Sequence, residues 1–141
     1  MRRKLIILAL GCAFLAAMTW IGTILVDIIP ARPTAALQTA QAGPYQLTLQ
    51  VEPNPPPTSQ PATLSIQVLR DKAPVSNAYI TLEGAMEAMD MGKEYAVAQE
   101  QSRGLYSAPM RFSMSGAWRV RVQIALPGAR AESAVFAITA Q

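Results

Sequence analysis

Methionine is dense in one part of this 141-residue chain, and its thioether is the side-chain group whose chemistry stands out most clearly. Five of the seven methionines lie between residues 86 and 114. Thioether sulfur is a soft ligand that suits Cu(I). The sequence therefore predicts a set of candidate metal ligands, with Met86, Met89 and Met91 as the main ligands and Met110 and Met114 as helpers.

The spacing of these methionines indicates how their sulfurs would meet. Met89 and Met91 are two residues apart, so on an extended segment both side chains point to one face. If the loop of residues 84–93 folds back over the turn at 112–116, three or four sulfurs converge beside Trp118, whose ring face attracts a cation. The alternative is that the methionines fill irregular gaps beneath a loop, because a flexible thioether side chain packs without demanding a shape. Both interpretations stay open at this stage.

Enzymatic chemistry has little support in the sequence. The chain has no histidine, which removes the commonest general base and the commonest transition-metal ligand. Four carboxylates surround the methionines and would either favour a cation or form the solvated edge of a loop: Glu83, Glu87, Asp90 and Glu94. We find no nucleophile and base pair, phosphate loop or zinc spacing. We therefore predict a protein that is not an enzyme.

Charge is balanced in the C-terminal two thirds of the chain. From residue 44 onward there are eight basic and eight acidic residues, so the high pI near 9.4 comes from the N-terminal part. No basic stripe interleaved with aromatic residues occurs there. The sequence thus predicts no nucleic-acid partner.

The N-terminal segment has the pattern of a membrane anchor. Residues 1–4 include three basic residues, and no charge occurs from Leu5 to Val26. We predict a cytoplasmic N-terminus and a transmembrane signal-anchor helix over residues 5–29, with the lipid bilayer as its partner. The C-terminal domain is then extracytoplasmic on a single-pass protein of the cell membrane. The alternatives are a cleaved signal peptide and a lipoprotein that uses Cys12, the one cysteine of the chain.

The remainder of the chain predicts a tether and one all-β domain. Residues 30–43 are rich in Ala, Thr, Gln and Pro and are expected to form a flexible tether. Apolar and polar residues then alternate in short segments separated by turn residues, which predicts an antiparallel β-sandwich of about seven strands over residues 44–141. The expected strands are 45–52, 64–68, 75–83, 94–99, 104–112, 117–126 and 130–139. Tyr106, Phe112 and Trp118 are expected to be the large core residues that join the two sheets.

Several short motifs resemble the YtkA-like domain family, over about residues 43–138. They are residues 72–78, which lead into a strand, the methionine loop at 86–92, Gly104-Leu105-Tyr106, and the run from Met114 to Trp118. The family is related in outline to FixH proteins and loosely to CopC-type copper proteins. The resemblance implies an immunoglobulin-like fold, an anchored or secreted location, and a role in copper handling or respiratory-oxidase maturation. Several relatives carry histidines in the methionine loop, where this chain has none.

Two hypotheses for function follow. In the first, a membrane-anchored extracytoplasmic β-sandwich binds Cu(I) through loop methionines and works with a membrane respiratory or copper-transport protein. In the second, the domain is a metal-free structural or protein-interaction module at the outer face of the membrane, and the methionines only pack.

Overall fold

The computed structural model describes residues 11–16, 18, 34–88 and 92–141. The chain divides into two units, residues 1–32 and 33–141. Residues 11–16 and 18 are helical. Among the described residues no helix combines the length and the hydropathy that a membrane crossing requires. Most of the predicted anchor, residues 5–29, lies outside the described residues.

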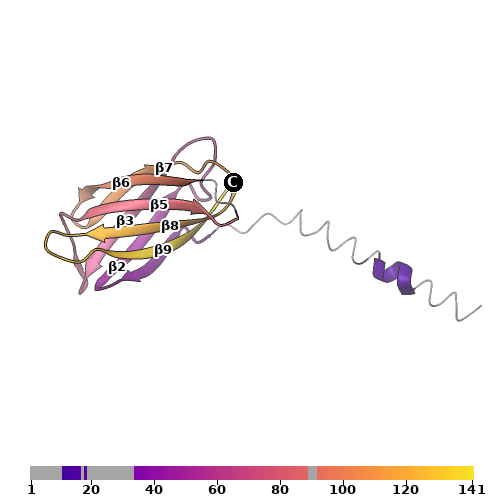
Figure 1. The fold of residues 1–141 in the computed structure, drawn as a ribbon, viewed down its shortest axis with the longest axis horizontal. Coiled ribbons are helices and arrows are strands. Elements are labelled where there is room, and N and C mark those ends of the chain that lie inside the picture. The colour runs from indigo at the N-terminus through magenta and orange to yellow at the C-terminus, as the bar shows by residue number, and fades with distance from the viewer. Residues whose placement is uncertain (1–10, 17, 19–33, 89–91) are drawn as a thin grey trace, which may run out of the picture. The chain divides into compact units, whose positions relative to one another are not determined.

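The second unit is all-β and antiparallel, as the alternating segments predict (Figure 1). Its described strands are β1 (Leu37–Ala42), β2 (Tyr45–Glu52), β3 (Ala62–Arg70), β4 (Ala73–Pro74), β5 (Tyr79–Met86), β6 (Lys93–Ser102), β7 (Leu105–Met110), β8 (Gly116–Ala125) and β9 (Glu132–Ala140). The strand count exceeds the predicted seven because β1 and the two-residue β4 were not expected.

The strands form two packed layers that share β6. One layer has the order β1-β2-β3-β7-β6, with β4 beside β3, and the other has the order β6-β5-β8-β9. The first part of β6, residues 93–98, pairs with β5, whereas residues 99–102 pair with β7 across a register shift. The fold is therefore a sandwich that closes almost into a barrel.

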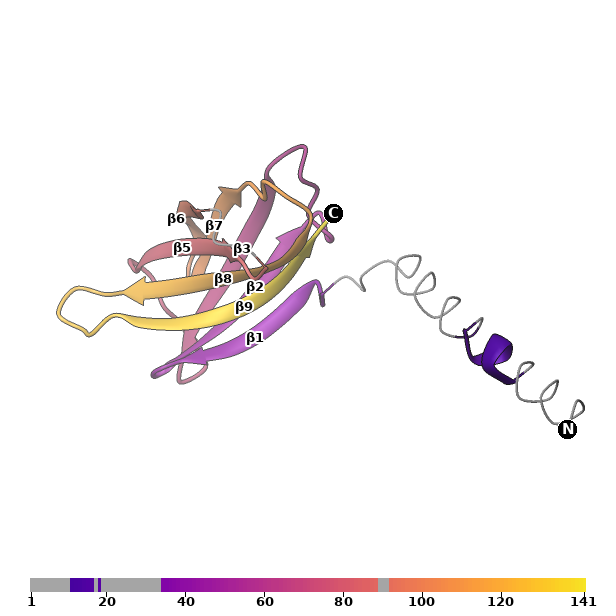
Figure 2. The ribbon, with the colours of Figure 1, turned by 45° about the vertical axis from the view of Figure 1, so that its right-hand side comes forward.

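The outer edges of the two layers, β1 and β9, lie side by side (Figure 2). Their contact uses side chains: the amide Nε2 of Gln38 donates to the carbonyl oxygen of Ala137 at 2.6 Å. The Thr34 hydroxyl oxygen accepts a hydrogen bond from the backbone N–H of Thr139 at 3.3 Å. Polar side chains thus satisfy backbone groups on an edge that would otherwise be open to further pairing.

The prediction of a flexible tether through residue 43 is wrong for its last part. Residues 37–42 pair with β2 in register, from Leu37 opposite Gln50 to Ala42 opposite Tyr45. The one large apolar residue of the segment, Leu37, is exposed, so its strand character depends on the neighbouring strand rather than on its own pattern. The β-domain begins before residue 44 for this reason.

The core consists of apolar side chains from both layers. Tyr106, Phe112 and Trp118 are each at least 97% buried, which confirms their predicted core role. Among the described residues no polar or charged residue is buried. Full burial of one large aliphatic or aromatic side chain stabilises a fold by about 1.5 to 3 kcal/mol, so this core can hold the domain together without a disulfide.

Candidate functional site

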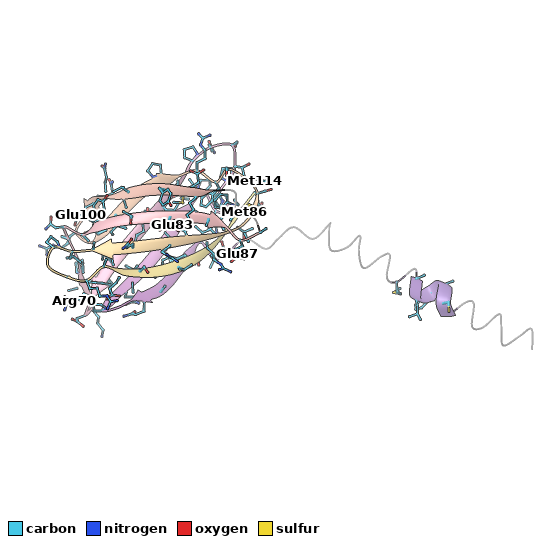
Figure 3. All side chains as sticks on the ribbon, in the orientation of Figure 1. Arg70, Glu83, Met86, Glu87, Glu100 and Met114 are labelled. Atoms are coloured by element: carbon cyan, nitrogen blue, oxygen red, sulfur yellow. The ribbon has the colours of Figure 1, made fainter. Side chains whose placement is uncertain are left out.

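A small pocket lies at one end of the sandwich, where four segments meet. Its volume is about 90 Å³, and we call it the sulfur pocket; its lining is Met86, Gly92, Lys93, Glu94, Ser113, Met114 and Trp118. Met86 ends β5, and Met114 lies in the turn between β7 and β8. Figure 3 shows both methionines at the end of the domain opposite Arg70 and Glu100. Two of the five predicted ligands are therefore brought together.

Strand register accounts for the position of Met86. Met86 is the β5 residue opposite Trp118 of β8. The pairing continues one residue further, where the backbone N–H of Glu87 donates to the carbonyl oxygen of Ala117 at 2.9 Å. The Glu87 carboxylate also accepts from the Arg119 Nε at 2.6 Å. Met86 is thus held by a complete ladder and not by a loose loop.

Gly116 makes room for the Met86 side chain. A Cβ atom on Gly116 would lie 2.8 Å from the Met86 Cε methyl, closer than carbon atoms normally approach. The φ angle of Gly116 is +133°, in a region that side-chain-bearing residues rarely adopt. The backbone conformation at this point requires glycine, and the absence of a Cβ atom leaves the Met86 methyl undisplaced.

Trp118 positions the second methionine. Its indole Nε1–H donates to the carbonyl oxygen of Met114 at 2.9 Å, so the ring fixes the turn that carries the thioether. The rings of Trp118 and Phe112 pack edge to face, with their centroids 5.4 Å apart and an angle of 82° between their planes. Trp118 therefore belongs to the core and also forms the floor of the sulfur pocket.

Met110 lies in the core and is 3% exposed. Its sulfur would be 3.2 Å from a Cβ atom on Gly84, so the absence of a side chain on Gly84 leaves space for it. Gly84 was expected to end its strand, but β5 continues through Gly84 to Met86 and the expectation is wrong. Met110 matches the packing interpretation of the methionines, whereas Met86 and Met114 line the pocket.

The other two predicted ligands, Met89 and Met91, lie outside the described residues, as does Asp90. Within the part of the chain that the structure describes, no group of three or more His, Cys, Asp or Glu could hold a metal ion. The pocket lining combines two thioethers and an indole ring, which are soft groups, with the Glu94 carboxylate and the Ser113 hydroxyl.

The charged residues at the pocket compensate one another. Lys93 and Glu94 both contribute to the lining. The Lys93 ammonium donates to the Glu83 carboxylate at 2.7 Å. This hydrogen bond lowers the pKa of Glu83 and raises the pKa of Lys93, so both stay ionised at neutral pH. Because Glu83 pairs with the Lys93 ammonium, the positive charge of Lys93 is partly neutralised and repels a cation in the pocket less strongly.

Comparison with known protein families identifies the family of this domain. The family model described as YtkA-like matches residues 39–123, which is more than half of the chain and includes every residue of the sulfur pocket. The chain belongs to the YtkA-like family. The match begins inside β1, in agreement with the pairing of that strand within the domain.

The fold of this YtkA-like domain is shared with a solved structure, a DUF4426 family protein from Pseudomonas aeruginosa PAO1. The TM-score is 0.55 at 12% sequence identity, and the alignment covers 72% of this chain and 94% of the other. Identity this low supports the fold alone. No curated protein gave a match.

The YtkA-like domain has a second feature that the sequence did not predict, on the outer face of the β6-β5-β8-β9 layer. Two shallow grooves of about 300 and 230 Å³ share Glu83 and Arg121 in their linings. Exposed Tyr95 and Val135 flank these charges. The alternation of Arg119 and Arg121 along one strand was visible in the sequence, but their neighbours depend on strand order.

Proposed function

We propose that this YtkA-like protein is a non-enzymatic, membrane-anchored module that binds a soft monovalent cation, Cu(I), in the sulfur pocket. The observation that carries the proposal is that Met86 and Met114 line one pocket whose floor is Trp118. Two thioethers from segments 28 residues apart in sequence are brought together by the β5 and β8 register and by the indole hydrogen bond. Core packing alone does not require these two residues to line a shared pocket.

The donors of the pocket fit Cu(I) better than other biological cations. Thioether sulfur is a neutral, soft ligand, so it favours Cu(I), whereas Ca²⁺ and Mg²⁺ prefer several oxygen ligands. The indole face of Trp118 adds electrostatic attraction for a cation. Glu94 at the rim contributes negative charge. When bound, Cu(I) would add a redox-active centre. Met86 and Met114 would hold the ion, and Trp118 would keep bulk water from the inner side of the pocket.

The fold and the N-terminal sequence support the location part of the proposal. The order β2-β3-β7-β6 in one layer and β5-β8-β9 in the other corresponds to the A-B-E-D and C-F-G sheets of immunoglobulin-type domains, which supports an immunoglobulin-like assignment. The uncharged run from Leu5 to Val26 after three basic residues supports a single-pass anchor with an extracytoplasmic domain. A respiratory or copper-transport protein of the same membrane is the proposed partner.

The test is an anaerobic Cu(I) titration of residues 33–141 against a chromophoric Cu(I) chelator. Trp118 is the one tryptophan in this segment, so its fluorescence reports directly on the pocket. We expect quenching at one equivalent, and at least a tenfold loss of affinity in Met86→Leu/Met114→Leu. Met110→Leu is the matched control, because it removes a thioether from the core with little change in volume. Equal affinity of the double variant and the wild type would refute the pocket site.

The sequence-predicted contribution of Met89 and Met91 is tested in the same titration. If these residues add ligands, Met89→Leu/Met91→Leu weakens Cu(I) binding beyond the Met110→Leu control. If the affinity is unchanged, Met86 and Met114 provide the sulfur donors without them.

A metal-free interaction module is the second candidate function, and the outer-face grooves favour it. Arg121 and Glu83 lie between the exposed side chains Tyr95 and Val135. Aromatic and arginine side chains are enriched at protein interfaces. A Tyr95→Ala/Arg121→Ala variant that loses its function in cells while retaining Cu(I) affinity would favour this candidate over the metal site.

A further inference from the structure

The sulfur pocket lies at the end of the sandwich that the N-terminal part of the chain joins. The carbonyl oxygen of Thr34 accepts from the Asn54 side-chain amide at 2.8 Å, and the Thr34 hydroxyl accepts from the backbone of Thr139 at 3.3 Å. The next residue of β9, Ala140, pairs with Gly116 beside the pocket. We call this end the pocket end, and the opposite end, which includes the turn after β8, the far end.

Distances along the sheet separate the two ends clearly. Thr139 pairs with Ala117, the neighbour of Trp118, and adjacent strands lie about 5 Å apart. Thr34, the first described residue of this unit, is therefore on the order of 10 Å from the pocket floor. The ten residues of β8 at about 3.3 Å each place the far turn roughly 33 Å from the pocket.

The length of chain between the predicted anchor and Thr34 limits how far the pocket can lie from a membrane. Five residue-to-residue steps separate Ile29 from Thr34, and each step spans at most about 3.6 Å, or about 18 Å in total. The pocket end then stays within about 30 Å of the bilayer surface, whatever angle the domain adopts. The far end can lie farther away, up to about 60 Å from the bilayer surface.

From this connectivity we propose that the pocket end docks on the outer surface of an integral-membrane protein in the same membrane, which exchanges the ion with the sulfur pocket. The inference rests on the proposed function, since it requires both the anchor and the soft-cation site. A water-soluble partner would have equal or better access to the far end, whereas a partner embedded in the membrane meets the pocket end first.

Charge favours a protein rather than lipid headgroups as the partner. Two basic side chains near the pocket are paired, Lys93 with Glu83 and Arg119 with Glu87, and exposed Arg111 adds one further positive charge there. More basic residues are exposed at the far end, namely Lys72, Arg103 and Arg130. An anionic bilayer attracts clusters of basic residues. Lipid binding would therefore draw the far end toward the membrane, whereas the pocket end is suited to a protein surface.

The first experiment measures which end faces the membrane, in the full-length chain reconstituted in vesicles. Cys12→Ser removes the native thiol, and single cysteines at exposed Ser115 and Ala129 carry a fluorescent donor at the pocket end and the far end. With an acceptor on lipid headgroups, we expect at least twofold more energy transfer from position 115 than from position 129. A flexible insert of about 20 residues after Pro33 is expected to abolish the difference. Equal transfer from both positions, or more from position 129, overturns the proposal.

The second experiment separates a protein partner from lipid. A photo-crosslinking residue at position 115 in intact cells is expected to give adducts with an integral-membrane protein that are absent from position 129 and are lost with the 20-residue insert. Adducts that persist with the insert would overturn the docking inference. Energy transfer from position 115 that rises with anionic lipid content would overturn it in favour of headgroup binding.

Failure of the proposed function is distinguishable from failure of this inference. Release of the full-length chain from membranes by alkaline carbonate would overturn both the anchor and the docking. If the isolated wild-type domain does not bind Cu(I), the ion-exchange role is overturned. The energy-transfer and crosslinking results decide the docking independently of that outcome.

Discussion

Replacement of Gly116 by alanine tests the construction of the sulfur pocket. Residues other than glycine rarely adopt a φ near +133°, and such strain costs about 1 to 3 kcal/mol. The new Cβ would also lie 2.8 Å from the Met86 methyl, which can move because it ends a flexible side chain. Displacement from a preferred rotamer adds about 0.5 to 1.5 kcal/mol. We expect Gly116→Ala to lower the free energy of unfolding by about 1.5 to 4.5 kcal/mol.

The assay is urea unfolding of residues 33–141, followed by Trp118 fluorescence. Gly128→Ala is the matched control, because Gly128 has a φ of +76° but nothing within 4 Å of a Cβ atom. It should cost about 1 to 2 kcal/mol, from backbone strain alone. In a Met86→Ala background the penalty of Gly116→Ala should shrink by about 0.5 to 1.5 kcal/mol, since the opposing methyl is gone.

The reasoning is refuted if Gly116→Ala costs no more than Gly128→Ala, or if its cost is independent of residue 86. A variant that stays folded also serves the Cu(I) titration. Displacement of the Met86 methyl should weaken binding in Gly116→Ala but not in Gly128→Ala.

Three further predictions concern parts of the domain away from the pocket. Tyr106→Phe should destabilise the domain by about 1 to 3 kcal/mol, because the hydroxyl donates to Val75 O and accepts from Ala78 N, and equal urea midpoints for the two proteins would contradict this. Hydrogen bonds from backbone N–H groups lower the pKa of Glu100 in the folded state. The stability that this carboxylate contributes is therefore complete above its ordinary pKa of about 4.5 and is lost as the pH falls through the lower pKa of the folded state. Glu100→Gln should flatten the fall of the urea midpoint at acid pH, and an unchanged pH profile of that midpoint would contradict the prediction. Gln38→Leu should speed hydrogen exchange of β1 amides while leaving β5 and β8 protected, since it removes the side-chain bond to β9; unchanged β1 exchange would rule out a role for that bond.

Strands with large alternating apolar residues were predictable from local sequence. The strand predicted over residues 45–52 has those same bounds in the structure, and the strand predicted over 117–126 differs from β8 by one residue at each end. In these segments every second side chain is large and apolar, so burial of one face suffices to specify a strand. The third strand was predicted to begin at Val75 but begins at Tyr79. The positive φ of Asn77 interrupts it, and periodicity does not reveal that feature.

Long-range contacts decided the features that local sequence missed. β1 is a strand because β2 lies beside it and Gln38 reaches β9, although after Leu37 its own residues are small or polar. Gly84 suggested the end of a strand, but its lack of a side chain accommodates Met110 from the next layer. The contact of Gln38 with Ala137 joins residues 99 positions apart in sequence, and that of Gly84 with Met110 joins two different layers of the sandwich.

The sequence alone determined that the chain has an all-β domain with Trp118 in its core, and that soft sulfur donors are concentrated between residues 86 and 114. It favoured the loop residues Met86, Met89 and Met91 as ligands, with Met110 and Met114 as helpers, but it did not show which of the five line a common pocket. Tertiary structure made that distinction for three of them: register sets Met86 opposite Trp118, the indole hydrogen bond holds Met114 beside it, and the space above Gly84 takes Met110 into the core. The physical reason is that a pocket is defined by which segments pair, and strand pairing is not encoded in the spacing of any one segment.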